Sequence, residues 1–268
     1  MSKNSRMVDA HAVPTVPLSG GGAMPIVGFG TWRLRVRPAC EAVRFALQVG
    51  YRHIDTATMY GNEAEIGRAL RDSGVERRDV FVTTKLPAGN AGRERETLAS
   101  SLRALGVGYV DLWLVHWPPQ RRARPQTWRE FLAAQEQGLA RAVGVSNYSI
   151  GQIDELTDAT GQAPAVNQIP WSPRRYDPRL LAAHRERGVA VEGYSPLKGT
   201  ELGDPVLAEI AAKHAVTPAQ VVLRWHIEHG IAVIPKSADR AHIASNFDLF
   251  GFSLDPGEVT RIEDEAHR

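Results

Sequence analysis

Short runs of β-branched and aromatic residues alternate with longer amphipathic segments along this sequence, from about residue 28 to near its end. Strands that alternate with helices in this way predict repeated βα units and a sheet of parallel strands. Eight such runs match the eight strands of a (β/α)8 TIM barrel, so the alternation predicts an α/β protein of that class. The predicted strands are residues 27–30, 51–55, 80–84, 110–115, 142–145, 165–168, 189–194 and 231–234.

The length of 268 residues fits one barrel domain, because α/β barrels commonly run to about 250 residues. No Pro/Ser-rich linker, charge run or low-complexity tract interrupts the alternation, so a second domain has no obvious boundary. We therefore predict a flexible segment over residues 1–12 and a single barrel domain over residues 13–268.

Additions to the barrel are expected at both of its ends. Residues 15–18 and 24–27 flank a glycine-rich turn, which predicts a small β-hairpin capping the bottom of the barrel. Beyond the last predicted strand, residues 238–250 and 255–268 predict additional C-terminal helices. Inside the barrel series, Asn62 is a predicted N-cap for the helix that follows the second strand.

Charge and composition exclude several classes of partner. The chain has 32 Lys and Arg against 30 Asp and Glu, so its formal charge of +2 gives no general attraction to nucleic acid or to an anionic membrane. No stretch approaches the roughly 18 apolar residues of a membrane span. A single cysteine, Cys40, forms no intramolecular disulfide, and the N-terminus lacks the apolar segment of a secretory signal. We expect a cytoplasmic protein.

Chemically active residues stand at the ends of the second, third and fourth predicted strands, where barrels build their active sites. Asp55 ends the second strand and Tyr60 lies in the loop after it, while Lys85 and His116 follow the third and fourth strands. Each alone has an ordinary explanation, such as a cap, a surface lysine or a core histidine. Their convergence on one mouth of the barrel favours a joint catalytic role.

The chemistry of this group follows from its ionisable side chains. A phenol with a pKa of about 10 is a poor proton donor at neutral pH, but an adjacent ammonium lowers that pKa. Lys85 is therefore expected to tune Tyr60, with Asp55 holding Lys85 charged and a neutral His116 bonding a substrate oxygen. Such a site protonates an oxygen and contains no hydride donor, so a reducing cofactor is required.

A series of short motifs then gives a specific resemblance. In their order and spacing these motifs resemble the aldo-keto reductases, from about residue 14 to the C-terminus, and most of all the bacterial branch that includes the diketogluconate reductases. The motifs are GFGTW at 28–32, DTA at 55–57, MYGNE at 59–63, TK at 84–85, LVHWP at 114–118, GVSN at 144–147, VNQ at 166–168, YSPL at 194–197 and IPKS at 234–237.

The resemblance implies NAD(P)H-dependent reduction of aldehydes, dicarbonyls or ketones to alcohols. It assigns Asp55, Tyr60, Lys85 and His116 to a catalytic tetrad in which Tyr60 is the general acid. For the cofactor it implies contacts from three groups of residues, which meet the nicotinamide, the ribose and pyrophosphate, and the adenine phosphate end. The nicotinamide residues are Ser146, Asn147, Gln168 and Tyr194, and the ribose and pyrophosphate residues are Thr31, Ser195 and Leu197. The residues at the adenine phosphate end are Lys236, Ser237, His242 and Asn246.

The walls of the substrate pocket are implied to be Trp32, Met59 and Trp117, whereas Trp171 is expected to pack in the core or at the rim. Resembling proteins usually carry residues beyond the final helix that fold over the site. The chain stops almost with that helix, so one wall of the pocket is expected to be missing and the reductase to be permissive. The expected partner is a small carbonyl substrate, and the protein is expected to be a monomer.

One departure from the family pattern concerns the choice of cofactor. His242 stands where the family has an arginine that clamps the 2'-phosphate of NADPH, and Ser245 stands where an acidic residue is expected before Asn246. Asp239 adds a negative charge nearby, which Arg240 partly offsets. We expect NADPH to be preferred, with NADH also possible.

Other functions fit the sequence less well. His53 and Asp55 resemble the start of a barrel metal site, but later strands end in Asn147, Gln168 and Lys236 instead of further ligands, so no metal is expected. A dinucleotide motif of the G-x-G-x-x-G type fails because position 33 is arginine. A regulatory or structural barrel that binds a cofactor without turnover stays open as the alternative.

Overall fold

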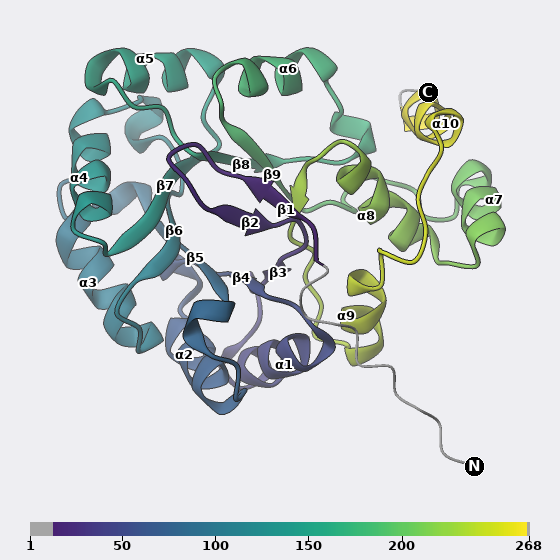
Figure 1. The fold of residues 1–268 in the computed structure, drawn as a ribbon, viewed down its shortest axis with the longest axis horizontal. Helices are drawn as coiled ribbons and strands as arrows, with labels where there is room; N and C mark the ends of the chain where they lie inside the picture. The colour runs from purple at the N-terminus through teal and green to yellow at the C-terminus, as the bar shows by residue number, and fades with distance from the viewer. Residues whose placement is uncertain (1–12, 267–268) are drawn as a thin grey trace.

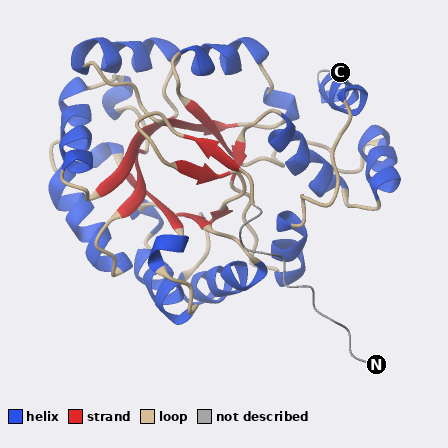
Figure 2. Cartoon of the chain, viewed as in Figure 1, coloured by secondary structure: helices blue, strands red, loops and turns tan. Residues whose placement is uncertain are grey.

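The structure is a computed structural model that describes residues 13–266. Its main sheet has eight parallel strands, each hydrogen-bonded to the strands next to it in chain order. Helices surround this sheet, as Figures 1 and 2 show. The predicted barrel class is therefore confirmed, while the predicted flexible segment at 1–12 lies outside the described residues. The strands are β3 Phe29–Gly30, β4 His53–Asp55, β5 Phe81–Leu86, β6 Val110–Val115, β7 Ala140–Ser146, β8 Val166–Pro170, β9 Ala190–Tyr194 and β10 Ala232–Val233.

Hydrogen bonds between the first and last strand segments close the sheet on itself. Val27 forms a parallel bridge with Val233, and the backbone of Gly28 donates to the carbonyl of Val233 over 2.9 Å. The backbone of Gly30 donates to the carbonyl of Pro235 over 3.0 Å. Glycine is needed for this approach, because a Cβ on Gly28 would lie 2.6 Å from the ring of His53.

Ten helices in the described chain cover the strands or extend beyond them. In the barrel series most helices follow a strand and bury an apolar stripe against it, which is how βα units form a core. The two helices after β10 confirm the predicted C-terminal additions, of which residues 267–268 lie outside the described residues. The helices are α1 Val36–Val49, α2 Glu63–Asp72, α3 Glu94–Leu105, α4 Pro125–Glu136, α5 Ile150–Thr160, α6 Pro178–Glu186, α7 Pro205–His214, α8 Pro218–Glu228, α9 Arg240–Phe247 and α10 Pro256–Ala266.

The predicted hairpin is present as β1 (Thr15–Pro17) and β2 (Ala23–Pro25), which pair antiparallel. Its turn passes through three consecutive glycines with φ between 82° and 101°, a region that other residues avoid. Met24 is fully buried and packs with Leu112 and Ala142 inside the barrel. The hairpin lies across the barrel opening in Figure 1 and closes the end at which the strands begin.

The structure modifies two details of the local prediction. Lys85 lies within β5 instead of after it, because its charge is paired inside the barrel and the strand continues to Leu86. Asn62 stands at the N-cap position of α2, but its side chain makes no capping bond. It donates instead to the carbonyls of Thr31 and Leu34. For Asn62, tertiary hydrogen bonds take the place of the local capping bond.

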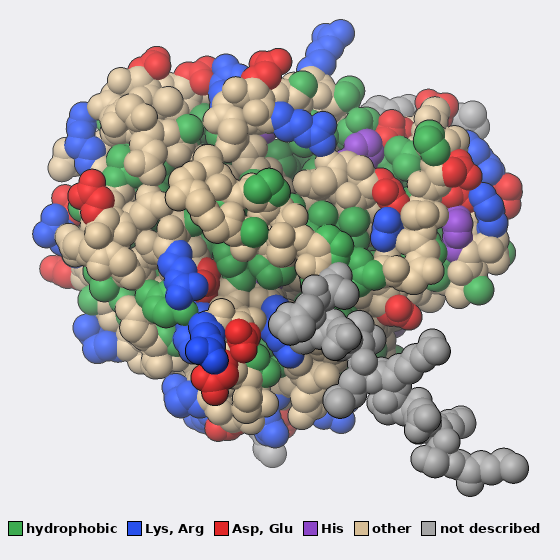
Figure 3. All heavy atoms as spheres, in the orientation of Figure 1, with side chains coloured by type: hydrophobic (Ala, Val, Ile, Leu, Met, Phe, Trp, Pro, Cys, Tyr) green, Lys and Arg blue, Asp and Glu red, His purple; other side chains and the backbone are tan. Residues whose placement is uncertain are grey.

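The surface shows no segregation of charge on the face drawn in Figure 3, where basic and acidic side chains are intermingled. This mixture agrees with the small formal charge of the whole sequence. Among residues 13–266, no helix has the length and apolar character that crossing a membrane requires.

Candidate active site

A cavity of about 790 Å³ opens where the strands end. Residues that follow β3, β4, β6, β7, β9 and β10 border it, so it forms at the usual active-site end of such a barrel. Its volume falls in the range of small-molecule and cofactor sites. The residues that line it include Trp32, Asp55, Met59, Tyr60, His116, Trp117, Ser146, Asn147, Gln168, Tyr194, Ser195, Leu197 and Lys236.

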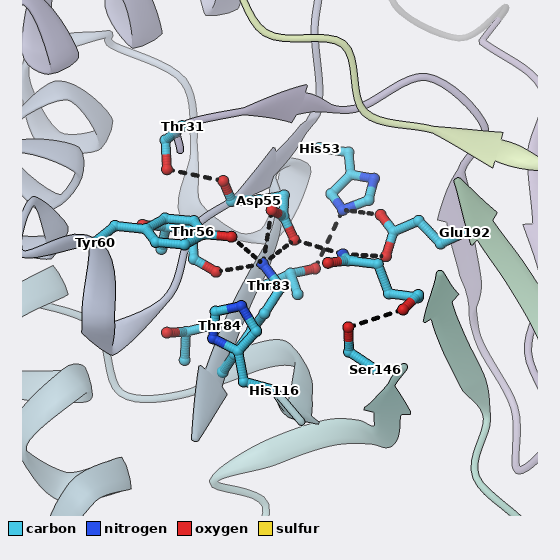
Figure 4. A network of polar contacts seen from close by, with 12 residues as sticks. Thr31, His53, Asp55, Thr56, Tyr60, Thr83, Thr84, His116, Ser146 and Glu192 are labelled. Atoms are coloured by element: carbon cyan, nitrogen blue, oxygen red, sulfur yellow. Dashed lines mark hydrogen bonds and ion pairs between the residues drawn. The ribbon is translucent and has the colours of Figure 1, made fainter. Parts of the chain in front are cut away.

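Lys85 is the central cation of the site and is fully buried. Its Nζ lies 2.7 Å from both carboxylate oxygens of Asp55, 2.8 Å from the carbonyl of Thr56 and 3.5 Å from the Tyr60 hydroxyl. Figure 4 shows these contacts converging on one nitrogen. Because the ammonium hydrogens point at these oxygens, the Lys85 nitrogen is held at a fixed point beneath the phenol.

The alternation of side chains along β5 places Lys85 inside the barrel. Residues two apart in a strand share a face, so Thr83 and Lys85 point inward while Thr84 points outward. The Thr84 hydroxyl accordingly donates to Glu63 of α2 over 2.6 Å. Lys85 is thus the only long side chain that β5 directs toward the Tyr60 hydroxyl.

Tyr60 ends a short 3-10 turn, Thr58–Tyr60, which Gly61 terminates in the left-handed region at φ 67°. Burial raises the pKa of Tyr60, and the nearby Lys85 charge lowers it by less. The expectation that Lys85 sets a lowered pKa therefore needs correction, because loss of solvation outweighs the ammonium. The phenol is protonated at neutral pH and, since its oxygen accepts from Lys85, its own hydrogen remains free to donate.

His116 follows β6 and faces the Tyr60 ring, with 5.7 Å between ring centroids. Burial, with a smaller contribution from the Lys85 charge, lowers the pKa of His116 to about 3. The imidazole is therefore neutral at physiological pH. Its Nδ1 is buried and has no hydrogen-bond partner within the described chain, so the ring is held by packing and not by a polar contact.

Four polar residues form a continuous chain along another side of the cavity. The Ser146 hydroxyl donates to the carbonyl of Gln168 over 2.8 Å, and the amide of Asn147 donates to Ser146 over 2.9 Å. The Tyr194 hydroxyl donates to the Asn147 oxygen over 2.8 Å. These groups were expected to meet the nicotinamide, and the fold does bring them together.

Sequence reasoning missed Glu192 and considered His53 only as a metal ligand, although both belong to the same network. Glu192 of β9 and His53 of β4 are both fully buried inside the barrel. The Gln168 amide nitrogen donates over 2.8 Å to Asp55 and over 2.8 Å to Glu192, which links this pair to the tetrad. A signal was present, because Glu192 stands two residues before Tyr194 and strand alternation gives both the same face.

Several predicted cofactor residues lie away from the cavity lining. Thr31 is fully buried and its hydroxyl donates to the backbone carbonyl of Asp55 over 2.9 Å. Ser237 is half-buried and accepts from the backbone of Asp239 over 3.0 Å. His242 is exposed on α9, with Nδ1 3.8 Å from the Asp239 carboxylate, and Asn246 is buried on the same helix.

The three expected pocket walls are the large apolar side chains that the fold leaves about half exposed: Trp32, Met59 and Trp117. Arg33, which sequence reasoning did not single out, also lines the cavity and stacks on Trp32 at 4.3 Å. Trp171 is buried in the core. Within residues 13–266, no three His, Cys, Asp or Glu side chains are grouped so as to hold a metal ion.

Comparison with known proteins gives one consistent family. The sequence profile of the Aldo/keto reductase family matches residues 26–266. An aldo-keto reductase of Mycolicibacterium smegmatis is 44% identical over 253 residues, covering 93% of this chain and 92% of the relative. The methylglyoxal reductase DkgA of Escherichia coli is 40% identical over 256 residues, covering 94% and 93%.

Solved structures agree with the sequence matches. The crystal structure of an aldo/keto reductase from Brucella melitensis superposes with a TM-score of 0.91 at 42% identity, covering 94% of this chain and 97% of that one. A Bombyx mori aldo-keto reductase in complex with NADP gives a TM-score of 0.88 at 34% identity, covering 96% and 94%.

Proposed function

Because this chain belongs to the aldo/keto reductase family, and is therefore an oxidoreductase that reduces carbonyl compounds, we propose that it reduces small aldehydes, dicarbonyls and ketones with NADPH as the preferred cofactor and Tyr60 as the proton donor. The observation that carries this proposal is the single path of contacts from Asp55 through Lys85 to the Tyr60 hydroxyl at the cavity. The path ends at a protonated phenol, which is the group that carbonyl reduction needs.

The residues along the cavity fit a nicotinamide. Ser146, Asn147 and Gln168 place hydroxyl and amide groups beside the Tyr194 ring, a combination that suits a flat ring with a carboxamide. The Gln168 side-chain oxygen accepts no hydrogen bond from the described residues, which leaves it available as an acceptor. When bound, the nicotinamide supplies the hydride.

The protein's own residues supply the proton and hold the substrate oxygen. Tyr60 and the neutral His116 lie side by side at the cavity, so both can bond one carbonyl oxygen. Tyr60 transfers its proton to that oxygen as the alcohol forms, and Lys85 stabilises the phenolate that remains. Asp55 keeps the ammonium in position, and solvent returns a proton to Tyr60.

Substrate breadth follows from the cavity walls. Trp32, Met59 and Trp117 offer apolar surface without a deep, closed slot, because each is about half exposed. One extra apolar contact separates related substrates by only about 1 to 3 kcal/mol. The relatives named methylglyoxal reductase make small dicarbonyls the first compounds to test.

The preference for NADPH rests on basic residues beyond β10. Lys236 lines the cavity and is exposed, and Arg240 at the start of α9 stacks on Phe45 at 4.6 Å. Both charges suit a phosphate, although His242 replaces the arginine that the family pattern places there. The monomeric state and the cytoplasmic location remain predictions from the sequence.

The decisive experiment compares Tyr60→Phe with the wild-type protein. Loss of a general acid costs roughly 10² to 10⁴ in rate, so kcat for methylglyoxal reduction should fall by that amount. NADPH affinity, measured by fluorescence quenching, should stay nearly unchanged. Full activity in the variant would refute the role of Tyr60. Absence of turnover in the wild type, with normal NADPH binding, would favour a regulatory barrel.

A further inference from the structure

The barrel interior holds two fully buried titratable side chains that the proposed mechanism does not use, His53 of β4 and Glu192 of β9. Figure 4 shows them on one side of Asp55, with Tyr60 on the other. A buried carboxyl group is costly unless it has partners or keeps its proton. The contacts of this pair indicate what it does.

The first contact fixes the orientation of an amide. The Gln168 nitrogen lies 2.8 Å from an oxygen of Asp55 and 2.8 Å from Oε2 of Glu192, so both of its hydrogens are donated. A flipped amide would direct its oxygen at two carboxyl groups. Asp55 and Glu192 together therefore hold the nitrogen inward, which leaves the oxygen for the cavity that Gln168 lines.

The second contact favours a proton between His53 and Glu192. Nδ1 of His53 lies 3.3 Å from the carbonyl of Pro25, which only accepts, so Nδ1 carries a hydrogen. Nε2 lies 3.1 Å from the Thr83 hydroxyl and 3.5 Å from Oε1 of Glu192. Oε1 has no hydrogen-bond partner in the described chain, so His53 at 3.5 Å is the titratable group that it faces. An ionised Glu192 would place a lone pair of Oε1 opposite the lone pair of Nε2, even where the Thr83 hydroxyl donates to Nε2, so the geometry favours a proton held between Glu192 and His53.

The charges around Glu192 favour the same conclusion. From β4, β5 and the 3-10 turn, His53, Asp55, Lys85 and Tyr60 face it, and Lys85 is the single permanent cation among them. Burial and the Asp55 charge raise the pKa of Glu192 to about 8. When Glu192 is protonated at neutral pH, the negative charge of Asp55 and the positive charge of Lys85 balance each other.

We propose that Glu192 is a positioning residue of this reductase, which orients the Gln168 amide toward the cofactor and holds, with His53, one proton beneath the tetrad. The cofactor part of this inference rests on the proposed function, while the proton-sharing part does not. When Glu192 loses its proton at alkaline pH, a second negative charge competes with Tyr60 for Lys85. Reduction then slows before Tyr60 itself ionises.

Two variants separate these roles. Glu192→Gln is a neutral replacement of similar shape that keeps an acceptor for Gln168 but cannot lose a proton at alkaline pH. The alkaline limb of its pH profile should move up by at least one pH unit. Glu192→Leu removes the acceptor from Gln168 and should weaken NADPH binding about tenfold, on the scale of one hydrogen bond. A wild-type alkaline limb in Glu192→Gln, or wild-type affinity in Glu192→Leu, would overturn the proposal.

A matched control is available in Glu63, another buried carboxyl group, whose partners are the hydroxyls of Thr84 and Ser101. Glu63→Gln should keep the wild-type alkaline limb, whatever its effect on rate. Loss of that limb in Glu63→Gln as well would overturn the assignment to Glu192.

Nitrogen NMR of His53 in the cofactor-free protein gives a readout that needs no turnover. In the wild type the His53 ring signals should shift with a midpoint near the Glu192 pKa of about 8, and in Glu192→Gln this shift should vanish. A His53 signal that shows no such midpoint in the wild type would overturn the shared proton. The result holds whether or not the protein reduces carbonyl compounds.

Discussion

The two ends of the cavity differ in how their side chains are held. At the catalytic end, Asp55 and Lys85 are buried and joined to their neighbours by several short hydrogen bonds. At the phosphate end, which we define as Lys236, Ser237 and His242, the residues are exposed or half-buried and make few contacts with the barrel. The groups proposed to act on the reacting atoms are thus held by buried hydrogen bonds, whereas the groups proposed to recognise the far end of the cofactor are largely open to solvent.

This difference has an energetic basis. A buried ion pair gains strength from its low-dielectric surroundings but becomes costly when one partner is removed. An exposed charge is screened by solvent and contributes about 1 kcal/mol or less to stability. Substitutions at the catalytic end should therefore affect both rate and stability, and those at the phosphate end should affect only cofactor affinity.

The largest expected effect is that of Lys85→Met, which leaves the Asp55 carboxylate without its cation. The rate should fall by a factor similar to that of Tyr60→Phe, and the free energy of unfolding should fall by about 3 to 5 kcal/mol. Urea denaturation and steady-state kinetics measure the two quantities. The double variant Asp55→Asn with Lys85→Met should regain much of the stability and none of the activity. Unchanged stability in Lys85→Met would show that the pair is less buried than its contacts indicate.

Acid pH should weaken the fold through its buried histidines. Burial lowers the pKa of His53 and of His226 to about 4, whereas an unfolded histidine titrates near 6.5. Between these values the unfolded chain binds more protons, so the free energy of unfolding decreases as pH falls from about 6.5 to about 4. Each fully shifted histidine contributes about 3 kcal/mol at 1.36 kcal/mol per pKa unit.

Denaturant midpoints measured from pH 7 to pH 4 would show this loss. His53→Gln should have a shallower decline than the wild type, because one of the titrating groups is gone. Equal slopes in the two proteins would mean that His53 keeps its proton in the fold and that Glu192 is the charged partner.

The smallest expected effect lies at the phosphate end. His242→Arg should raise the preference for NADPH over NADH by about 1 to 2 kcal/mol, the scale of one charge-assisted hydrogen bond. Fluorescence titration with both cofactors measures the ratio, and kcat with saturating NADPH serves as the control that should not change. A strong preference for NADPH that the substitution leaves unaltered would assign the clamp to Arg240.

Much of the fold could be predicted because it repeats. Each βα unit carries its own apolar pattern, so the eight strands and the hairpin were found from local sequence, although strand limits shifted where polar residues are paired inside the barrel. The four residues of the proposed tetrad could be selected because they stand at or near strand ends and match motifs in order, and the fold brings them together. For Glu192 and His53, the sequence offered only strand alternation as an indication that their side chains point into the barrel, and this indication is weaker than a motif.

Other features depended on quantities that a sequence does not contain. The raised pKa of Tyr60 results from the extent of burial, which outweighs the expected influence of Lys85. The hydroxyl of Thr31, which stays a predicted cofactor residue, donates to the backbone of Asp55, and no local pattern indicates that bond. The role of Asn62 likewise depended on which carbonyls the folded chain brings within its reach.

The seam between Val27 and Val233 has a consequence for how the barrel is assembled. The two segments lie near opposite ends of the described chain, so their pairing closes a very long loop and carries a large entropic cost. All other neighbouring strands follow one another in sequence and can pair as the chain is made. We therefore expect the barrel to close last, with the edges of β3 and β9 open to other chains until β10 has been made.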